Sequence, residues 1–505
     1  MGEAFVKFYR EKIKSHWKIA FTAVMVIGLL THIYKFTNLL LNHDSTASVY
    51  HDQNMTGSGR WFLTIACMFS TYFDLPWVIG LFSLVFIGLT AVIIVEMFNI
   101  EKPVPCILVA GILVTFPAVT TTFFYEFTAD GYMLAMLMSA LAIYLTTLEK
   151  RKILFSVISV ILLCLSCGTY QAYISFGLML VACNFILKLI DGKLSNKDCF
   201  KYIGKYLIIF AASLVLYYVV WKILMKIQGV APVDYQGIND VGTLNINLVT
   251  ILGVIRSFGG FFVKEGIGDI YSILNIAFVI CLCIAGSYVI IRKKVFERKI
   301  QLGLLFLACL AIPYCIYAIR FISPGAFYYT IMLQSFSLVY ILLVIIADKY
   351  VNLKLKNTVA ILLSLIIFNF SIMANKAYYI MDLNNKSMYA LSLKISTRVE
   401  QVMTSNDLKI AFIGRANAEA KVSEELPIKI FYSDGTNLYG GILDTGMIAY
   451  TRNMIKSDYN WASYDVIKEL SQTEEVKNMP LWPLSGSVKV IDDTVVVKME
   501  DIVYD

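Results

Sequence analysis

Long windows free of charge constrain this chain more than any other feature of its sequence. Several windows of about twenty residues hold no Asp, Glu, Lys or Arg, and this length crosses the hydrocarbon core of a bilayer. Backbone groups inside hydrocarbon must be hydrogen-bonded within the protein, so each window predicts a helix. Overall, 58% of the residues are hydrophobic and 16% are charged, whereas about a quarter are charged in soluble domains. The sequence therefore predicts a mainly α-helical, polytopic membrane protein.

We expect about eleven spans and no cleavable signal peptide, because the first apolar run is too long for one. Two shorter apolar stretches, 61–73 and 248–263, suit helices in the headgroup plane, with re-entrant or packing segments as the alternative. The predicted spans are 19–41, 75–98, 103–119, 130–148, 152–168, 170–190, 203–224, 270–291, 301–320, 326–347 and 357–376.

Basic residues predict how the chain is oriented. They gather in alternate connectors. If eleven spans are counted, these connectors all lie on one side of the membrane. Connectors rich in Lys and Arg face the cytoplasm. An odd number of spans then places the C-terminus outside. The net charge of +7 is therefore an orientation signal rather than evidence of nucleic-acid binding. We predict a bacterial cell-membrane protein with a cytoplasmic N-terminus. The basic segments are the N-terminus, 149–152, 188–205, 292–299 and 348–356.

The composition changes near residue 382, where a small α/β domain is predicted. Residues 385–404 have the apolar spacing of an amphipathic helix, and ASYDVIKELS also predicts a helix. LKIAFIG (408–414) and IKIFYS (428–433) predict strands, and SVKVIDDTVVVKM predicts a hairpin turning at Asp492 and Asp493. We therefore divide the chain into a transmembrane catalytic domain, 1–381, and an extracytoplasmic domain, 382–505.

Acidic and aromatic residues collect on the side opposite the basic connectors. Carboxylates beside imidazoles at the end of a span can perform general-base chemistry, although a solvated connector is the alternative for 42–61. Glu126 and Asp130 are four residues apart and would share a helix face, with first-turn acids at a helix N-terminus as the alternative. Gln171 can bond sugar hydroxyls or simply begin a helix. The candidate site residues here are Asp44 and Asp130 as catalytic carboxylates, and His43, Asp52, Arg60, Glu126, Tyr170 and Gln171 as substrate-binding residues.

Arg320 ends an apolar span on this side, where a cation needs a partner. A phosphate would supply one, because the guanidinium forks onto phosphate oxygens, whereas snorkelling to water is the alternative. Arg256 and Lys264 are further candidates for the same role.

The sequence has no GxxxxGK[ST], GxGxxG or HExxH motif, so neither a nucleotide nor a structural metal is indicated. Charges are rare in the middle of the spans, where ion and proton pathways place them. This pattern favours a reaction at the outer membrane surface. A need for a divalent cation is left open.

Three segments resemble the GtrII-type glucosyltransferases: NHDSTASVY…GSGRW after the first span, FTADGY before the fourth, and GTYQAYISF at the sixth. The closing MPLWPLSGSVKVIDDTVVVK (479–498) is similar to that family's C-terminal end. The resemblance implies a GT-C-like membrane fold that moves a sugar, here glucose, from a polyprenyl-phosphate donor to a cell-surface glycan. It also implies an Asp base in the first outer loop, which Asp44 matches best, and a second outer acid at Asp130.

The chemistry agrees with this implication. A carboxylate can activate the acceptor hydroxyl as an oxocarbenium-like state forms, and a base opposite the leaving phosphate gives inversion. The alternatives are a lipid-linked glycan transporter or flippase, a polysaccharide polymerase or ligase, and a non-catalytic partner subunit. A transporter would show inverted repeats and midplane charges, which this sequence lacks.

Overall fold

The computed structural model describes residues 13–42, 44–45, 50–233, 247–263, 268–322, 328–415, 451–452, 454–455 and 459–504. The chain forms two compact units. One unit comprises the described parts of Met1–Asn38 and His51–Asn375, and the other those of Leu39–Tyr50 and Lys376–Asp505. The division falls within α16, a few residues before the boundary expected at 381.

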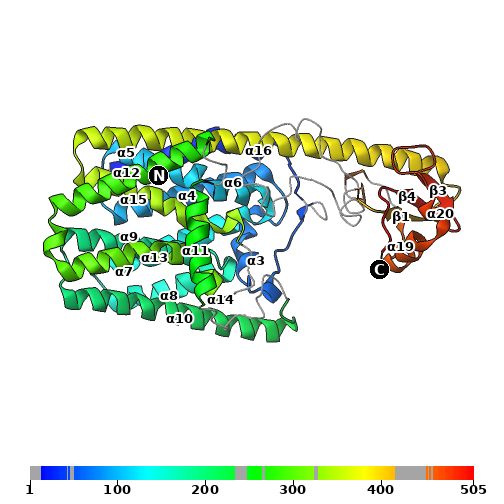
Figure 1. The fold of residues 1–505 in the computed structure, drawn as a ribbon. Coiled ribbons are helices and arrows are strands. Elements are labelled where there is room, and N and C mark those ends of the chain that lie inside the picture. The colour runs from blue at the N-terminus through cyan, green and yellow to red at the C-terminus, as the bar shows by residue number, and fades with distance from the viewer. Residues whose placement is uncertain are drawn as a thin grey trace, which may run out of the picture. The chain divides into compact units, whose positions relative to one another are not determined.

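The first unit is a bundle of apolar helices (Figure 1). Within the described residues, ten helical segments are long and apolar enough to cross a membrane, which confirms the mainly α-helical, multi-span prediction. The ten segments are α2 (Ser15–Phe36), α4 (Pro76–Met97), α5 (Pro103–Thr115) together with α6 (Pro117–Phe124), α7 (Ala129–Thr147) with the turn before it, α8 (Lys152–Thr169), α9 (Tyr173–Asp191), α10 (Asn196–Gln228), α12 (Ile270–Arg292), α13 (Lys299–Ile316) and α16 (Leu353–Val402). A further apolar helix, α15 (Ser337–Tyr350), is too short at 14 residues to be one of the ten.

Proline and glycine set several helix ends. Pro76, Pro103 and Pro117 each begin a helix, where a missing N–H costs nothing because that group has no partner inside the helix. Gly192 and Gly229 end α9 and α10 in the left-handed conformation, which glycine adopts without strain. Pro117 also separates α5 from α6, so the predicted third span is two helices in succession.

Two predicted elements differ from the structure. The stretch 326–347 is not one helix, because the 3-10 turns η7 (Thr330–Met332) and η8 (Gln334–Phe336) precede the shorter α15. The Gln334 side-chain amide donates to the Leu113 carbonyl. A buried polar group normally has a hydrogen-bond partner of this kind. The separate helices predicted at 357–376 and 385–404 are one 50-residue helix, α16, because no Pro or Gly interrupts the sequence between them.

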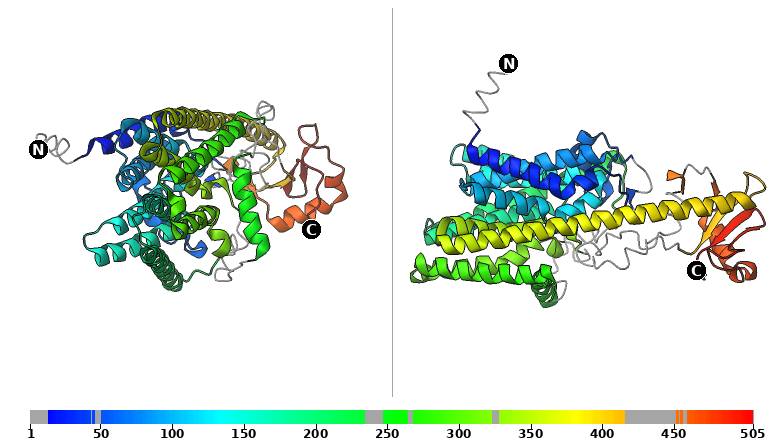
Figure 2. Two further views of the ribbon diagram at one scale, coloured as in Figure 1. Left: turned by 60° about the vertical axis from the view of Figure 1, so that its left-hand side comes forward. Right: turned by 90° about the horizontal axis from the view of Figure 1, so that it is seen from above.

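The two stretches predicted to lie in the headgroup plane, 61–73 and 248–263, contain short helices. α3 (Leu63–Ala66) and η3 (Met68–Ser70) lie within 61–73, and α11 (Leu248–Phe261) accounts for 248–263. Figures 1 and 2 show α11 crossing the direction of the bundle helices. Leu248, Val249 and Leu252 of α11 are exposed, whereas its Phe258 and Phe261 stack on Phe336. The helix is therefore amphipathic, and one face packs on the bundle.

Ion pairs join the basic connectors at one end of the first unit. Lys14 pairs with Glu96, which ties the start of α2 to the end of α4. Asp348 accepts from Lys102 and Lys356, which ties the α4–α5 connector to the α15–α16 connector. Since neighbouring helices alternate in direction, the C-terminal end of α2 and the N-terminal ends of α4 and α7 meet at the opposite end.

The second unit contains a four-stranded mixed sheet in the order β2-β1-β4-β3. β1 (Lys409–Ile413) and the hairpin β3 (Val488–Ile491) and β4 (Thr494–Lys498) confirm the strands predicted there, with Asp492 at positive φ in the turn. β2 (Asn460–Trp461) pairs with β1, and α19 (Tyr464–Gln472) confirms the helix predicted in ASYDVIKELS. The strand predicted at 428–433 lies outside the described residues. Ile395 and Val399 of α16 pack against the sheet.

Candidate functional site

The loop after α2 is held against the ends of several helices. The His51 N–H donates to the Tyr72 carbonyl at 2.8 Å, and the Phe62 N–H donates to the Gly168 carbonyl at 2.7 Å. The indole N–H of Trp221 in α10 donates to the Thr56 carbonyl at 2.7 Å. These bonds tie the backbone of the loop to α8, to α10 and to the segment before α4. The His51–Trp61 loop is therefore a fixed part of the first unit.

A buried ion pair lies beside this loop. Lys35, in the last turn of α2, pairs with Glu126 of η4 (Glu126–Thr128), just before α7. The lysine side chain is 1% exposed and the glutamate side chain 7%. Burying either charge without its partner would strongly destabilise the folded protein, so each residue can be buried only because the other lies beside it. Glu126 is thus a paired carboxylate that joins α2 to η4.

Asp74 is a second buried acid at the same helix ends. It lies two residues before the start of α4. Its side chain is 1% exposed, and neither carboxylate oxygen has a hydrogen-bond partner among the described residues. His51 Nε2 lies 4.0 Å from Asp74 Oδ2. Burial raises the pKa of Asp74 to about 7, the Glu126 charge adds to this rise, and Lys35 opposes it. At neutral pH this carboxyl group is therefore close to half protonated.

Asp130 lies in the first turn of α7 and is completely buried. One carboxylate oxygen accepts from the Gly131 N–H at 2.9 Å. Ser70 and Cys67, from the segment before α4, lie beside the carboxylate. Asp130 therefore has different neighbours from Glu126, although the two residues are four apart.

Arg60, Tyr132 and Tyr170 form a stacked cluster. The Arg60 guanidinium donates to the Tyr132 hydroxyl at 3.1 Å and lies over the ring of Tyr170. The rings of Tyr132 and Tyr170 are parallel, with centroids 4.2 Å apart. The structure thus brings together the predicted Arg60 and Tyr170 and adds Tyr132, the tyrosine of the FTADGY segment.

Gln171 stabilises the turn that leads to Arg60. Its amide donates to the Ser58 carbonyl and to the Tyr217 hydroxyl, each at 3.1 Å, and the Tyr217 hydroxyl donates to the Gly59 carbonyl. These contacts position the loop through its backbone.

The acids at the start of the connector are exposed. Asp44 belongs to the second unit, and its N–H donates to the Asn42 side chain at 3.0 Å. Asp52 is also exposed and accepts from the Asn54 N–H. His43 lies outside the described residues.

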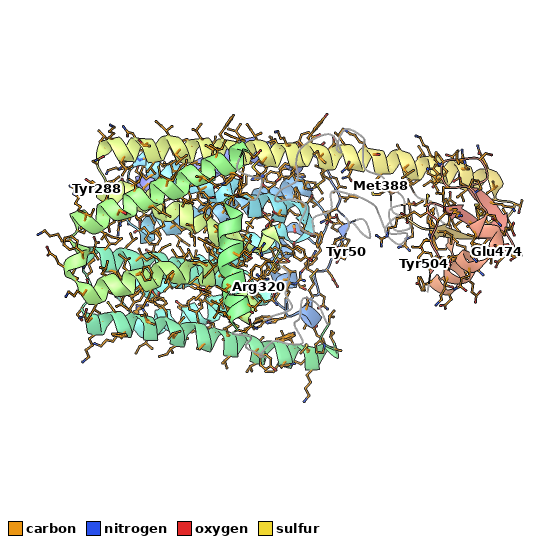
Figure 3. The ribbon with its side chains drawn as sticks, in the orientation of Figure 1. Tyr50, Tyr288, Arg320, Met388, Glu474 and Tyr504 are labelled. Atoms are coloured by element: carbon orange, nitrogen blue, oxygen red, sulfur yellow. The ribbon has the colours of Figure 1, made fainter. Side chains whose placement is uncertain are left out.

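Among the predicted cations, Arg320 lies in the short helix α14 (Ile319–Ile322) after α13. Its guanidinium is 3.5 Å from the Ser257 hydroxyl of α11, and Figure 3 shows it away from the bundle end that carries Tyr288. Arg256 is exposed on α11, and Lys264 lies outside the described residues. In the described part of the chain, no three His, Cys, Asp or Glu side chains are grouped to hold a metal.

Comparison with known families identifies the family of the chain. The model of the Glucosyl transferase GtrII family matches residues 33–347, more than half of the chain. The chain belongs to the GtrII glucosyltransferase family. This GtrII protein is therefore a membrane transferase that uses a sugar donor and an acceptor. The match includes the three segments on which the resemblance rested, whereas 479–498 lies beyond it. No curated protein and no solved structure matches the chain.

Lys35 and Asp74 were not among the residues predicted for the site. A lysine inside the first apolar span was a usable signal, because such a residue requires a partner. Asp74 gave no comparable signal, since an acid before a proline-started helix is an ordinary feature of a helix N-terminus.

We expect removal of the Lys35 charge alone to destabilise the protein strongly. In Lys35→Met, Glu126 remains buried without its cation, which costs about 3–5 kcal/mol for a broken buried pair. In Lys35→Met/Glu126→Gln both charges are gone, so most of this loss should be recovered. The measurement is thermal unfolding of the purified protein in detergent.

Lys201→Met provides the matched control, because the Lys201–Asp198 pair is exposed and exposed pairs contribute little. If the double variant is no more stable than Lys35→Met, the two buried residues are not coupled and this account of the pair is wrong.

Proposed function

We propose that this GtrII-family protein transfers glucose from a polyprenyl-phosphate donor to a cell-surface glycan at the outer face of the membrane. The family match supports the transferred sugar. The lipid-linked donor is supported by the absence of a nucleotide-binding motif from the sequence. Nucleotide sugars are cytoplasmic, so an outer site needs a donor carried by lipid. No divalent cation is assigned a role in this proposal.

The proposed reaction inverts the configuration of the anomeric carbon. The acceptor hydroxyl attacks this carbon as the bond to the lipid phosphate breaks, and a carboxylate takes the hydroxyl proton. We assign the carboxylate to Asp44, as predicted from its place in the first connector. Its exposure is compatible with access by a large glycan. Asp130, completely buried, is assigned an indirect role as the second acid.

Arg320 is proposed to bind the leaving phosphate. It lies in α14, shortly after the apolar helix α13 ends at Ile316, and beside α11, a helix with one apolar exposed face. Such a position would meet a headgroup whose hydrocarbon chain stays in the bilayer. Arg256 and Lys264 are secondary candidates. His43, Asp52, Arg60, Tyr170 and Gln171 are proposed to bind substrate or to hold the loop that does.

Asp44→Asn should lower glucose transfer by roughly a hundredfold or more, the usual scale for a positioned base. The assay uses purified protein in lipid vesicles, polyprenyl-phosphate glucose as donor and surface polysaccharide as acceptor, and it measures radioactive glucose in the polysaccharide. Asp52→Asn should cost less, because its carboxylate holds the loop through the Asn54 N–H.

Two results would contradict the proposal. Transfer from UDP-glucose but not from the lipid donor would exclude the proposed donor. Wild-type transfer by folded Asp44→Asn would exclude this base. Movement of intact lipid-linked sugar between leaflets, without transfer, would indicate a flippase.

Arg320→Ala should raise the KM for the lipid donor by at least tenfold, because a forked contact with phosphate is lost. Arg320→Lys should reverse only part of this rise in donor KM, since an ammonium group cannot form the forked contact with phosphate. Arg256→Ala is the comparison, with a smaller expected effect because Arg256 is exposed. Unchanged donor KM in Arg320→Ala would assign this residue to snorkelling instead.

The second unit should lie outside the cytoplasm, with the basic connectors inside. A cysteine placed at the exposed Glu474 should react with a membrane-impermeant thiol reagent in intact cells, whereas one at exposed Glu297 should react only after lysis. The unaltered chain, with its ten cysteines, sets the background. The reverse labelling pattern would overturn this orientation.

A further inference from the structure

The buried acid Asp74 has no role in the reaction proposed above. Its side chain is 1% exposed and neither oxygen is hydrogen-bonded within the described residues. Buried carboxylates normally have such partners, so an exception calls for a functional explanation. Three ionisable groups from three elements face it: His51 of the loop, Glu126 of η4 and Lys35 of α2.

The His51 ring links Asp74 to the loop. Its Nε2 lies 4.0 Å from the carboxylate, and its ring stacks on Phe127 with centroids 4.6 Å apart. The backbone N–H of the same residue donates to Tyr72, two residues before Asp74. The imidazole is thus fixed between the carboxylate and η4, and a small movement would close the contact to hydrogen-bond length.

The loop is anchored further at residues that follow His51. The Gln53 amide donates to the Phe127 carbonyl at 2.9 Å, and Arg60 donates to Tyr132. A change of charge at His51 would therefore act on the segment that also carries Arg60.

We propose that Asp74 and His51 share one proton, and that this proton holds the His51–Trp61 loop in the position needed for transfer. With the proton on either residue, the pair has no net charge. Once the proton is lost, Asp74 and Glu126 are two buried carboxylates beside the single cation Lys35. The second buried negative charge raises the free energy of this arrangement. A displacement of His51 would lower that free energy again. Asp74 and His51 are positioning residues in this scheme, which rests on the transfer reaction proposed above.

The sign of the pH dependence follows from the direction of the Asp74 pKa shift. Burial and the Glu126 charge raise this pKa from 3.8 to about 7. The folded protein therefore keeps a proton that the unfolded chain releases between about pH 4 and pH 7. The contribution of this group to stability falls as the pH rises through that range. The loop therefore stays in its active position below about pH 7 and leaves that position at higher pH.

Transfer by the wild type should consequently fall about fivefold from pH 7 to pH 8, in proportion to the fraction of the pair that keeps its proton. Asp74→Asn has a permanently neutral side chain of the same shape, so it should remain active and lose this decline. His51→Gln should also lose the decline, and the effects of the two substitutions should not add. Glu101→Gln, at an exposed acid in the α4–α5 connector, should keep the wild-type profile.

A second readout needs no substrate. The melting temperature of purified Asp74→Asn should exceed that of the wild type by an amount that grows from pH 5 to pH 7. This measurement tests the pair even if the lipid donor proves to be wrong. A wild-type pH profile in Asp74→Asn, or a pH-independent difference in melting temperature, would overturn the shared proton. Loss of transfer at every pH in folded Asp74→Asn would overturn the positioning role and make Asp74 itself a catalytic base.

Discussion

The Lys35–Glu126 ion pair is the contact on which the arrangement of the helix ends depends. It joins α2 to the turn before α7 at a place from which water is excluded. A charge there is stable only if its partner is held at close range, so the pair requires the ends of these helices to stay together. Asp74, at the start of α4, lies within the field of the same two charges. Three helices are thereby fixed around one small group of ionisable residues.

The two ends of the first unit use charge differently. At one end, exposed and half-buried pairs such as Lys14–Glu96 and Lys102–Asp348 connect the basic segments. Pairs in contact with water contribute little to stability, and Lys14 lies in one of the basic segments that predict the orientation. At the other end Asp74, Glu126 and Asp130 are buried, and burial raises the pKa of Asp74. Buried acids whose proton affinity has shifted are a common property of functional sites.

The His51–Trp61 loop contains a short 3-10 helix, η2 (Thr56–Ser58), and a single bridge between Met55 and Arg60, and contacts from neighbouring segments hold the rest of it. Gln171, Tyr217 and Trp221 donate hydrogen bonds to its backbone carbonyls. Gly168 leaves room for the Trp61 ring, because a Cβ added at Gly168 would lie 2.6 Å from that ring. Such a loop can be precise, because its contacts come from helices and from the turns that join them. It can also respond to a single change of charge, because no hydrogen-bond ladder holds it.

The sequence by itself determined the membrane class, most spans and the C-terminal hairpin, because charge-free windows and alternating apolar residues are local patterns. It also indicated the family through short segments that the family model covers. It did not predict the merging of two segments into α16, since polar residues such as Asn384 and Lys386 continue a helix when no Gly or Pro stops it. Only the tertiary structure decided which acids are buried and with whom. Lys35 and Glu126 are 91 positions apart in the chain, and the pKa of Asp74 is raised first by burial and then by the charge of Glu126 on another element. Burial and electrostatic coupling depend on packing between distant segments, and no local pattern encodes them.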